Sequence, residues 1–138
     1  MNDAATSSST RPRKVLDASR KRVNFRTAAF ETYSLQGKPQ DDIAWHNVSY
    51  DETTGEGFFL VRIRPGGRSI PHEHLGYEEF VVLEGEIEDC DGTVYRSGDC
   101  VSLVKGSRHV STSANGATVA VFIRGGFRTL DPREPVDG

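Results

Sequence analysis

The sequence has no long apolar run and very little cysteine. No stretch approaches the roughly 18 consecutive apolar residues of a membrane-spanning helix, and the first residues lack the apolar core of a secretory signal. Two cysteines are too few for a disulfide framework, and Cys90 and Cys100 lack the CxxC spacing of a zinc or redox motif. These absences predict a cytoplasmic protein with no membrane partner, in which Cys90 and Cys100 are buried or half-buried free thiols.

Positive charge is concentrated near the N-terminus. The first 26 residues carry seven Lys or Arg against two Asp, a charge of +5, so the total of −3 leaves −8 on the remainder. Residues 1–20 are rich in Ser, Thr, Ala and Arg and offer almost nothing to a core, which predicts a disordered basic arm. No aromatic residue precedes Phe25, which argues against nucleic-acid binding and favours a solvated arm.

The segment from residue 21 to 42 fits two structures. Val23, Phe25, Ala29 and Phe30 are compatible with a strand that pairs with a neighbour and also with a short helix. We expect this segment to pack on the rest of the fold or on a partner chain.

From residue 43 onward, short apolar runs alternate with turn signals. Asp91-Gly92 and Asn115-Gly116 lie between apolar runs and predict hairpins, because glycine accepts the positive φ of a type I′ turn. Short strands at even spacing predict an all-β domain, either an antiparallel barrel or a double-sheet jelly roll. The expected strands cover residues 43–50, 57–64, 79–84, 86–90, 93–96, 100–104, 109–113 and 117–124, and residues 126–138 are expected to form a surface tail.

Three of the four histidines stand in a metal-ligand pattern. His72 and His74 are two residues apart, so a strand would place both imidazoles on one face. Glu78 follows a turn that can bring its carboxylate back toward them, and His109 returns after two hairpins. Three imidazoles and one carboxylate suit Fe, Mn, Ni, Cu or Zn, which predicts one mononuclear metal site. His46 has no partner pattern and is expected to be structural or surface-exposed.

These residues resemble the two motifs of the cupin superfamily. The first motif is matched by Gly66, His72-Glu73-His74, Glu78 and Gly85 at the family's spacing, and the second by Gly98, Gly106 and His109. The second motif departs from the family pattern at Val104, where a proline is usual, and at Ser113, where an asparagine is usual. Neither departure removes a metal ligand. The resemblance covers residues 45–125 and implies a cupin double-stranded β-helix, with the barrel over residues 43–125.

Within the cupins, the run from Tyr77 to Gly85 and the segment Gly106-Ser107-Arg108-His109 are most similar to the cupin domain of zinc-binding anti-sigma factors. The same residues are similar to small one-domain cupins such as the acetylacetone-cleaving dioxygenase. The anti-sigma proteins carry a separate helical domain for the sigma factor, and 138 residues leave no room for one. The comparison therefore favours the enzymes.

Strand alternation predicts a pocket beside the metal. If His109 and Glu78 point inward, their neighbours at even spacing do so too, which gives a mostly apolar cavity for a small organic molecule. This alternation gives Phe80, Val82, Ser111 and Ser113 as candidate pocket residues. Two further candidates are Tyr77, which could gate the pocket or donate to a substrate, and Arg62, which could anchor a carboxylate.

The resemblance implies a function as well as a fold. It implies a dioxygenase for a small dicarbonyl, phenolic or enediol compound, with Fe(II) as the favoured metal, Glu78 as a catalytic base and a homodimeric assembly. Two alternatives are a metal-dependent isomerase or lyase, and a non-catalytic zinc-binding sensor.

Overall fold

The computed structural model describes residues 17–35 and 37–136. These residues fold into strands, and the only helical element among them is a 3-10 turn, η1 (Asp17–Ser19). The strands are β1 (Glu31–Leu35), β2 (Lys38–Asn47), β3 (Gly57–Ile63), β4 (Gly67–Arg68), β5 (His72–His74), β6 (Tyr77–Asp89), β7 (Val94–Arg96), β8 (Cys100–Leu103), β9 (Arg108–His109), β10 (Ser111–Ser113), β11 (Ala117–Arg124) and β12 (Phe127–Thr129). The predicted all-β, jelly-roll architecture is confirmed.

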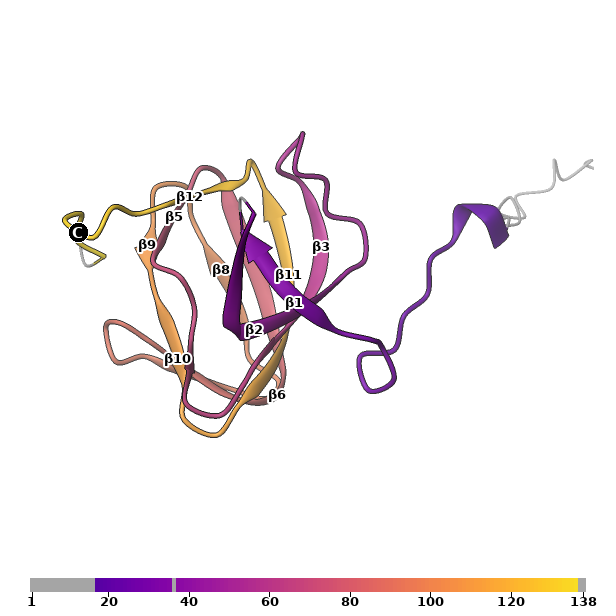
Figure 1. Cartoon of the computed structure of the whole chain (residues 1–138), viewed down its shortest axis with the longest axis horizontal. Helices are drawn as coiled ribbons and strands as arrows, with labels where there is room; N and C mark the ends of the chain where they lie inside the picture. The colour runs from indigo at the N-terminus through magenta and orange to yellow at the C-terminus, as the bar shows by residue number, and fades with distance from the viewer. Residues whose placement is uncertain (1–16, 36, 137–138) are drawn as a thin grey trace, which may run out of the picture.

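Two antiparallel sheets curl into the barrel shown in Figure 1. The larger sheet has the order β1-β2-β3-β11-β6-β10-β4, and the smaller one has the order β12-β5-β9. Strand β6 belongs to both halves of the larger sheet, because its first part pairs with β8 and β11 and its second part with β7 and β10. The two strands expected at 79–84 and 86–90 are therefore one continuous strand.

Gly85 allows β6 to continue through this change of partners. Its φ is +75°, in the left-handed region, and a side chain there would place its Cβ only 2.0 Å from the carbonyl oxygen of Gly116. Only glycine fits such a close approach between two backbones. The close backbone packing therefore explains why the first motif has a glycine at this position, whether or not a metal is bound.

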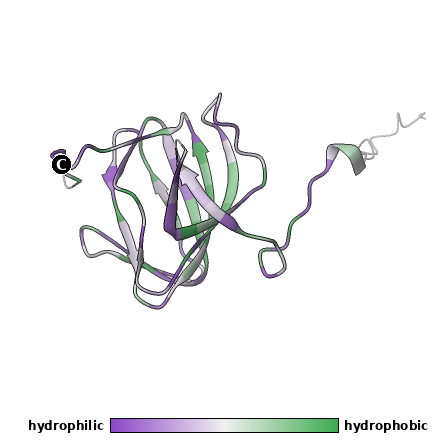
Figure 2. Ribbon diagram, in the orientation of Figure 1, coloured by the Kyte–Doolittle hydropathy of each residue, from purple (hydrophilic) through white to green (hydrophobic). Residues whose placement is uncertain are grey.

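The core lies between the curled sheets and follows strand alternation. Val119, Val121 and Ile123 of β11 face inward and pack with Phe80 and Val82 of β6. Figure 2 shows hydrophobic, green segments along β11 and β3. With Phe59 and Ile63 of β3, the inward residues of β6 and β11 form the apolar cluster that supports the site.

The prediction of buried cysteines is wrong, since Cys90 and Cys100 are both exposed free thiols. Alternation explains both cases. Asp89 points inward at the end of β6, so the next residue, Cys90, points outward, and Val101 packs on the core while Cys100 faces solvent.

Each terminal segment adds a strand to the fold. Residues 1–16 of the expected arm lie outside the described part of the chain, whereas the ambiguous segment supplies a strand, β1, on the edge of the larger sheet. The expected surface tail instead returns as β12 and pairs with β5, aided by Gly125 and Gly126 at positive φ. No helix in the described ranges has the length and apolar character needed to cross a membrane.

Candidate metal centre

The three histidines of the predicted site meet on the smaller sheet. His72 on β5 lies directly opposite His109 on β9, and His74 is two residues further along β5. Glu78 reaches the same place from the start of β6, after a tight turn at Gly76, where a Cβ would lie 1.8 Å from the carbonyl oxygen of Arg124. The sequence pattern therefore brings its four candidate ligands together.

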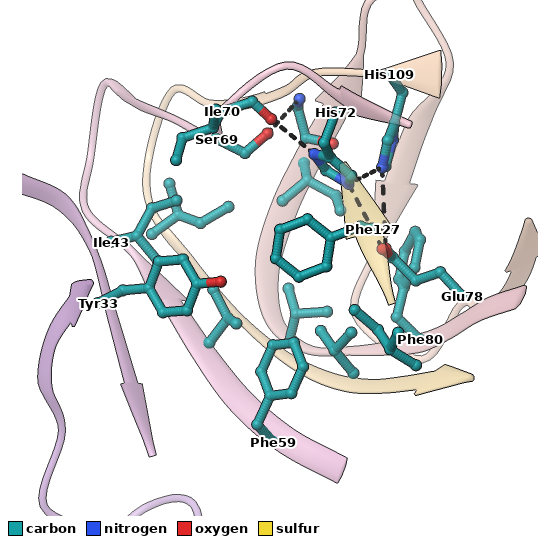
Figure 3. A pocket seen from close by; sticks show the side chains of 17 residues that line it. Tyr33, Ile43, Phe59, Ser69, Ile70, His72, Glu78, Phe80, His109 and Phe127 are labelled. Atoms are coloured by element: carbon teal, nitrogen blue, oxygen red, sulfur yellow. Dashed lines mark hydrogen bonds and ion pairs between the residues drawn. The ribbon is translucent and has the colours of Figure 1, made fainter. Parts of the chain in front are cut away.

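Their donor atoms are close enough to contact one ion. The His72 Nε2 lies 3.0 Å from the Nε2 of His74 and 3.0 Å from the Nε2 of His109. The Glu78 carboxylate is 2.6 Å from the Nε2 of His74 and 3.6 Å from that of His72. One donor atom from each of the four residues lies within 4.8 Å of all the others. Figure 3 shows His72, His109 and Glu78 converging.

The outer nitrogens of two of these imidazoles are committed as donors. The Nδ1 of His72 lies 2.7 Å from the carbonyl oxygen of Ile70, and the Nδ1 of His109 lies 2.9 Å from a carboxylate oxygen of Asp89. Carbonyl and carboxylate oxygens only accept hydrogen bonds, so each Nδ1 carries the proton. In the neutral rings, both Nε2 atoms therefore present a lone pair to the cluster.

The third imidazole, that of His74, also has its Nδ1 committed as a donor, in this case to a hydroxyl. The Nδ1 of His74 lies 2.8 Å from Ser107 Oγ, and this hydroxyl donates its own proton to the carbonyl oxygen of Val104 at 2.7 Å. Ser107 must then accept from His74, which leaves the Nε2 of His74 as another lone pair. This arrangement of outer partners, which fixes the tautomer, is typical of metal-binding histidines.

Three lone pairs and a carboxylate facing one another repel unless a cation lies between them, so the donor set fits a divalent transition metal. His72, His74, His109 and Glu78 would hold such an ion, each through one donor atom.

Both carboxylates at the site are ionised at neutral pH. Burial raises the pKa of Glu78, but the adjacent imidazoles of His72 and His74 outweigh burial and hold that pKa well below its usual range. Burial likewise raises the pKa of Asp89, and its bonds with His109 and Ser111 lower it further than burial raises it. The two negative charges would offset the charge of a divalent ion.

An apolar cavity of about 110 Å³ opens beside the cluster. His72, Glu78 and His109 line one end of it, while His74, 1 % exposed, lies behind them. The other walls are aliphatic and aromatic, with Ile43, Phe59, Val121, Ile123 and Phe127 among them. The arrangement can hold a small, mostly apolar molecule against a bound metal.

Two of the six predicted pocket residues line this cavity. Phe80 and Ser111 do so, because they share the inward phase of Glu78 and His109. Val82 and Ser113 are also inward but lie outside the cavity lining. Val82 is fully buried in the core, and the Ser113 hydroxyl donates to the carbonyl oxygen of Glu86.

Tyr77 and Arg62 lie on the outer face. Tyr77 precedes Glu78 and so points the other way, where the Arg124 guanidinium lies over its ring. The Arg62 guanidinium lies 3.9 Å from the ring centroid of Phe30, on the outer surface of β3. Neither residue lines the cavity, which removes the predicted carboxylate anchor.

Most of the apolar lining was not predicted, and sequence reasoning also missed Asp89, Tyr33 and Phe127. Asp89 binds His109, while Tyr33 from β1 and Phe127 from β12 line the cavity. His46, expected to be structural or surface-exposed, is outside the cluster and its Nδ1 donates to the carbonyl oxygen of Ala29. Tyr33 and Phe127 are aromatic residues in the terminal segments, and their aromatic character was the one sequence signal that could have indicated a role in the cavity.

Solved structures of several cupins resemble this fold. An acetylacetone dioxygenase from Acinetobacter johnsonii has a TM-score of 0.69 at 13% identity, over 92% of this chain and 87% of that one. The polyketide cyclase RemF from Streptomyces resistomycificus has a TM-score of 0.66 at 19% identity, over 85% and 89%. The anti-sigma ChrR from Rhodobacter sphaeroides, in complex with SigE, gives a TM-score of 0.58 at 15% identity, over 72% and 50%.

At these identities the solved structures show the fold alone. No curated protein matches the sequence significantly. The family described as the ChrR cupin-like domain, however, matches residues 23–127, which is most of the sequence and includes both motifs and β1. The chain therefore belongs to the ChrR cupin-like family.

Proposed function

We propose that this cupin is a mononuclear metal-dependent dioxygenase that acts on a small dicarbonyl, phenolic or enediol compound. The observation that carries the proposal is the cavity, which has three of the four candidate ligands in its wall. A purely structural metal site is saturated by protein ligands and has no need of a ligand-sized space beside it. Fe(II) is the favoured metal, and the same donors would also accept Zn, Mn, Ni or Cu.

When bound, the metal would supply Lewis-acid and oxygen chemistry. His72, His74, His109 and Glu78 would hold it, and the outer partners of the imidazoles keep the three Nε2 lone pairs aimed at one point. The Glu78 carboxylate lines the cavity and would accept a proton from a substrate carbon or hydroxyl. The apolar walls would keep water from the reacting groups.

The size of the cavity restricts the substrate. A cavity of about 150 Å³ lined by apolar side chains holds benzene. The space here is about 110 Å³, so a compact substrate of a few carbon atoms fits better than a fused-ring compound. The named substrate of the acetylacetone dioxygenase is of that size, which supports the dicarbonyl class.

A second candidate is a non-catalytic zinc cupin that senses or binds a small ligand. The specific observation in its favour is the family itself, which is described after the anti-sigma ChrR. An isomerase or lyase is a third, since the fold is also that of the cyclase RemF. The sensor would bind a ligand without turning it over, and the isomerase would turn it over without consuming oxygen.

Oxygen uptake by the Fe(II)-loaded protein separates these candidates. The dioxygenase should consume oxygen with acetylacetone or catechol, and Glu78→Gln should keep much of its metal while turnover falls by about 100-fold or more. Glu79→Gln is the matched control, because Glu79 is the next residue on the same strand and pairs with Arg124 on the outer face.

His109→Ala should lose metal and activity together. If the losses in Glu78→Gln and His109→Ala merely track metal content, Glu78 is a ligand and no base. If the metal-loaded parent shows neither oxygen uptake nor isomerisation with Fe, Mn, Ni or Zn, the dioxygenase proposal is wrong and the sensor replaces it.

A further inference from the structure

Tyr33 enters the cavity from an irregular point of the larger sheet. Along β1, Thr32 pairs with Ala44 of β2, but the next residue, Tyr33, pairs with Gln40, so the register shifts between them. Irregularities of this kind re-aim side chains and are frequent next to active sites. Figure 3 shows the Tyr33 hydroxyl pointing into the cavity from the β1 side.

The ring of Tyr33 is held while its hydroxyl is left free. The ring packs edge-on against Trp45, with the centroids 5.2 Å apart, and lies in the cavity wall beside Ile43 and Phe59. Within residues 17–35 and 37–136, the hydroxyl makes no hydrogen bond. A phenol hydroxyl without a protein partner can still form a hydrogen bond with water or with a ligand in the cavity.

The other two hydroxyls of the cavity wall already have partners. The Ser111 hydroxyl donates to Asp89 at 2.6 Å, and Ser69 Oγ accepts from the backbone N–H of Ser111 at 2.9 Å. The Ser69 hydroxyl keeps a free proton, but among the described residues Tyr33 is the hydroxyl of this wall that has no hydrogen-bond partner at all. Burial raises the pKa of Tyr33, and the charges of Tyr50, Glu52 and Glu78 raise it further, so the phenol keeps its proton and acts as a donor.

We propose that Tyr33 is the specificity-determining residue of the cavity and donates a hydrogen bond to an acceptor oxygen of the ligand. The cavity would then select compounds with two oxygens, one held at the metal end and the other bonded to Tyr33, joined by a short apolar skeleton. This inference rests on the proposed metal site, but it applies equally to a substrate and to a sensed ligand.

The test compares two ketones of similar size that differ in one carbonyl oxygen. Zn(II)-loaded protein is titrated calorimetrically with acetylacetone and with 2-pentanone, because zinc has no redox chemistry and binding is then separated from oxidation. Tyr33→Phe removes only the hydroxyl. Tyr50→Phe is the matched control, since Tyr50 packs on Phe59 but does not line the cavity.

Tyr33→Phe should weaken acetylacetone binding about 5- to 10-fold, the usual effect of one hydrogen bond, and change 2-pentanone binding by less than about twofold. Tyr50→Phe should change neither. Equal affinity of the parent and Tyr33→Phe for acetylacetone would overturn the inference. So would equal losses for both ketones, or a dissociation constant for the parent above about 1 mM, the top of the usual range for substrates.

Failure of the inference can be distinguished from failure of the proposed function. Absence of bound zinc in the parent would contradict the metal site itself. A selective loss of acetylacetone affinity in Tyr33→Phe, together with no oxygen uptake by the iron-loaded parent, would support the role of Tyr33 and reject the dioxygenase.

Discussion

The two ends of the cavity are built in opposite ways. At the metal end, every imidazole has its outer nitrogen bonded to a fixed acceptor, supplied by Ile70, Ser107 or Asp89. At the other end, Tyr33 comes from β1, a short strand at the edge of the larger sheet, and its position depends on packing. The metal end is thus fixed by directional hydrogen bonds, and the end that holds Tyr33 is fixed by packing alone.

The largest effect should come from removing the most buried ligand. His74→Ala deletes a lone pair and leaves the Ser107 hydroxyl without its donor, so metal affinity should fall by more than about 100-fold. Competition with a chromophoric chelator measures the affinity, and circular dichroism checks the fold. Retention of the parent's affinity by a folded variant would show that His74 is not a ligand.

Removal of an outer partner should have a smaller effect at the same end. Asp89→Asn keeps the shape of the side chain but removes the charge that holds the Nδ1 proton of His109, so metal affinity should fall about 10- to 100-fold. The same chelator competition measures it. An unchanged metal affinity would mean that the hydrogen bond between Asp89 and His109 does not orient the His109 ring for metal binding.

A change at the apolar end should leave the metal alone. Ile43 is 8 % exposed and lines the cavity on the side of Tyr33, so Ile43→Val should cost about 1 kcal/mol of stability and enlarge the cavity by one methylene. Chemical denaturation gives the stability, and the metal affinity should equal that of the parent. A drop in metal affinity comparable to that of Asp89→Asn would remove the distinction between the two ends.

The smallest effect should come from Glu73, which lies between two ligands but faces outward. Its carboxylate pairs with Arg108 and Arg128, whose guanidinium groups hold its pKa below the usual range, with burial opposing them. Glu73→Gln should leave metal affinity unchanged and lower the melting temperature only slightly, because exposed ion pairs contribute little. A loss of metal would show that this outer pair positions β5.

Three of the four candidate ligands could be placed together from the sequence because their geometry is local. His72 and His74 are fixed by the period of a strand, and Glu78 by one tight turn. The inward phase of Glu78 also correctly gave Phe80. Contacts of this kind depend on neighbouring residues, which a sequence displays directly.

Asp89 could not be found this way because β6 changes phase. Counting by twos from Glu78 places Asp89 on the outer face, yet it is buried and bonded to His109. The register with β11 shifts at Leu83, and the inward positions resume at Ile87 and Asp89. A bulge is set by pairing with another strand, so alternation alone does not reveal it.

The terminal contributions depend on long-range pairing. Tyr33 reaches the cavity through the irregular pairing of β1 with β2, and Phe127 through the pairing of β12 with β5. Both segments are short and have weak patterns of their own. Their aromatic residues could have been expected to pack on the core, but the sequence does not show that they line the cavity.

The most direct test of the account is the metal content of the parent and of His109→Ala after both are loaded with Fe(II) or Zn(II) and freed of excess metal. The three aimed Nε2 atoms and the ionised Glu78 predict one ion per chain in the parent and almost none in the variant. A parent that retains no transition metal, or a folded His109→Ala that retains a full equivalent, would contradict the central claim.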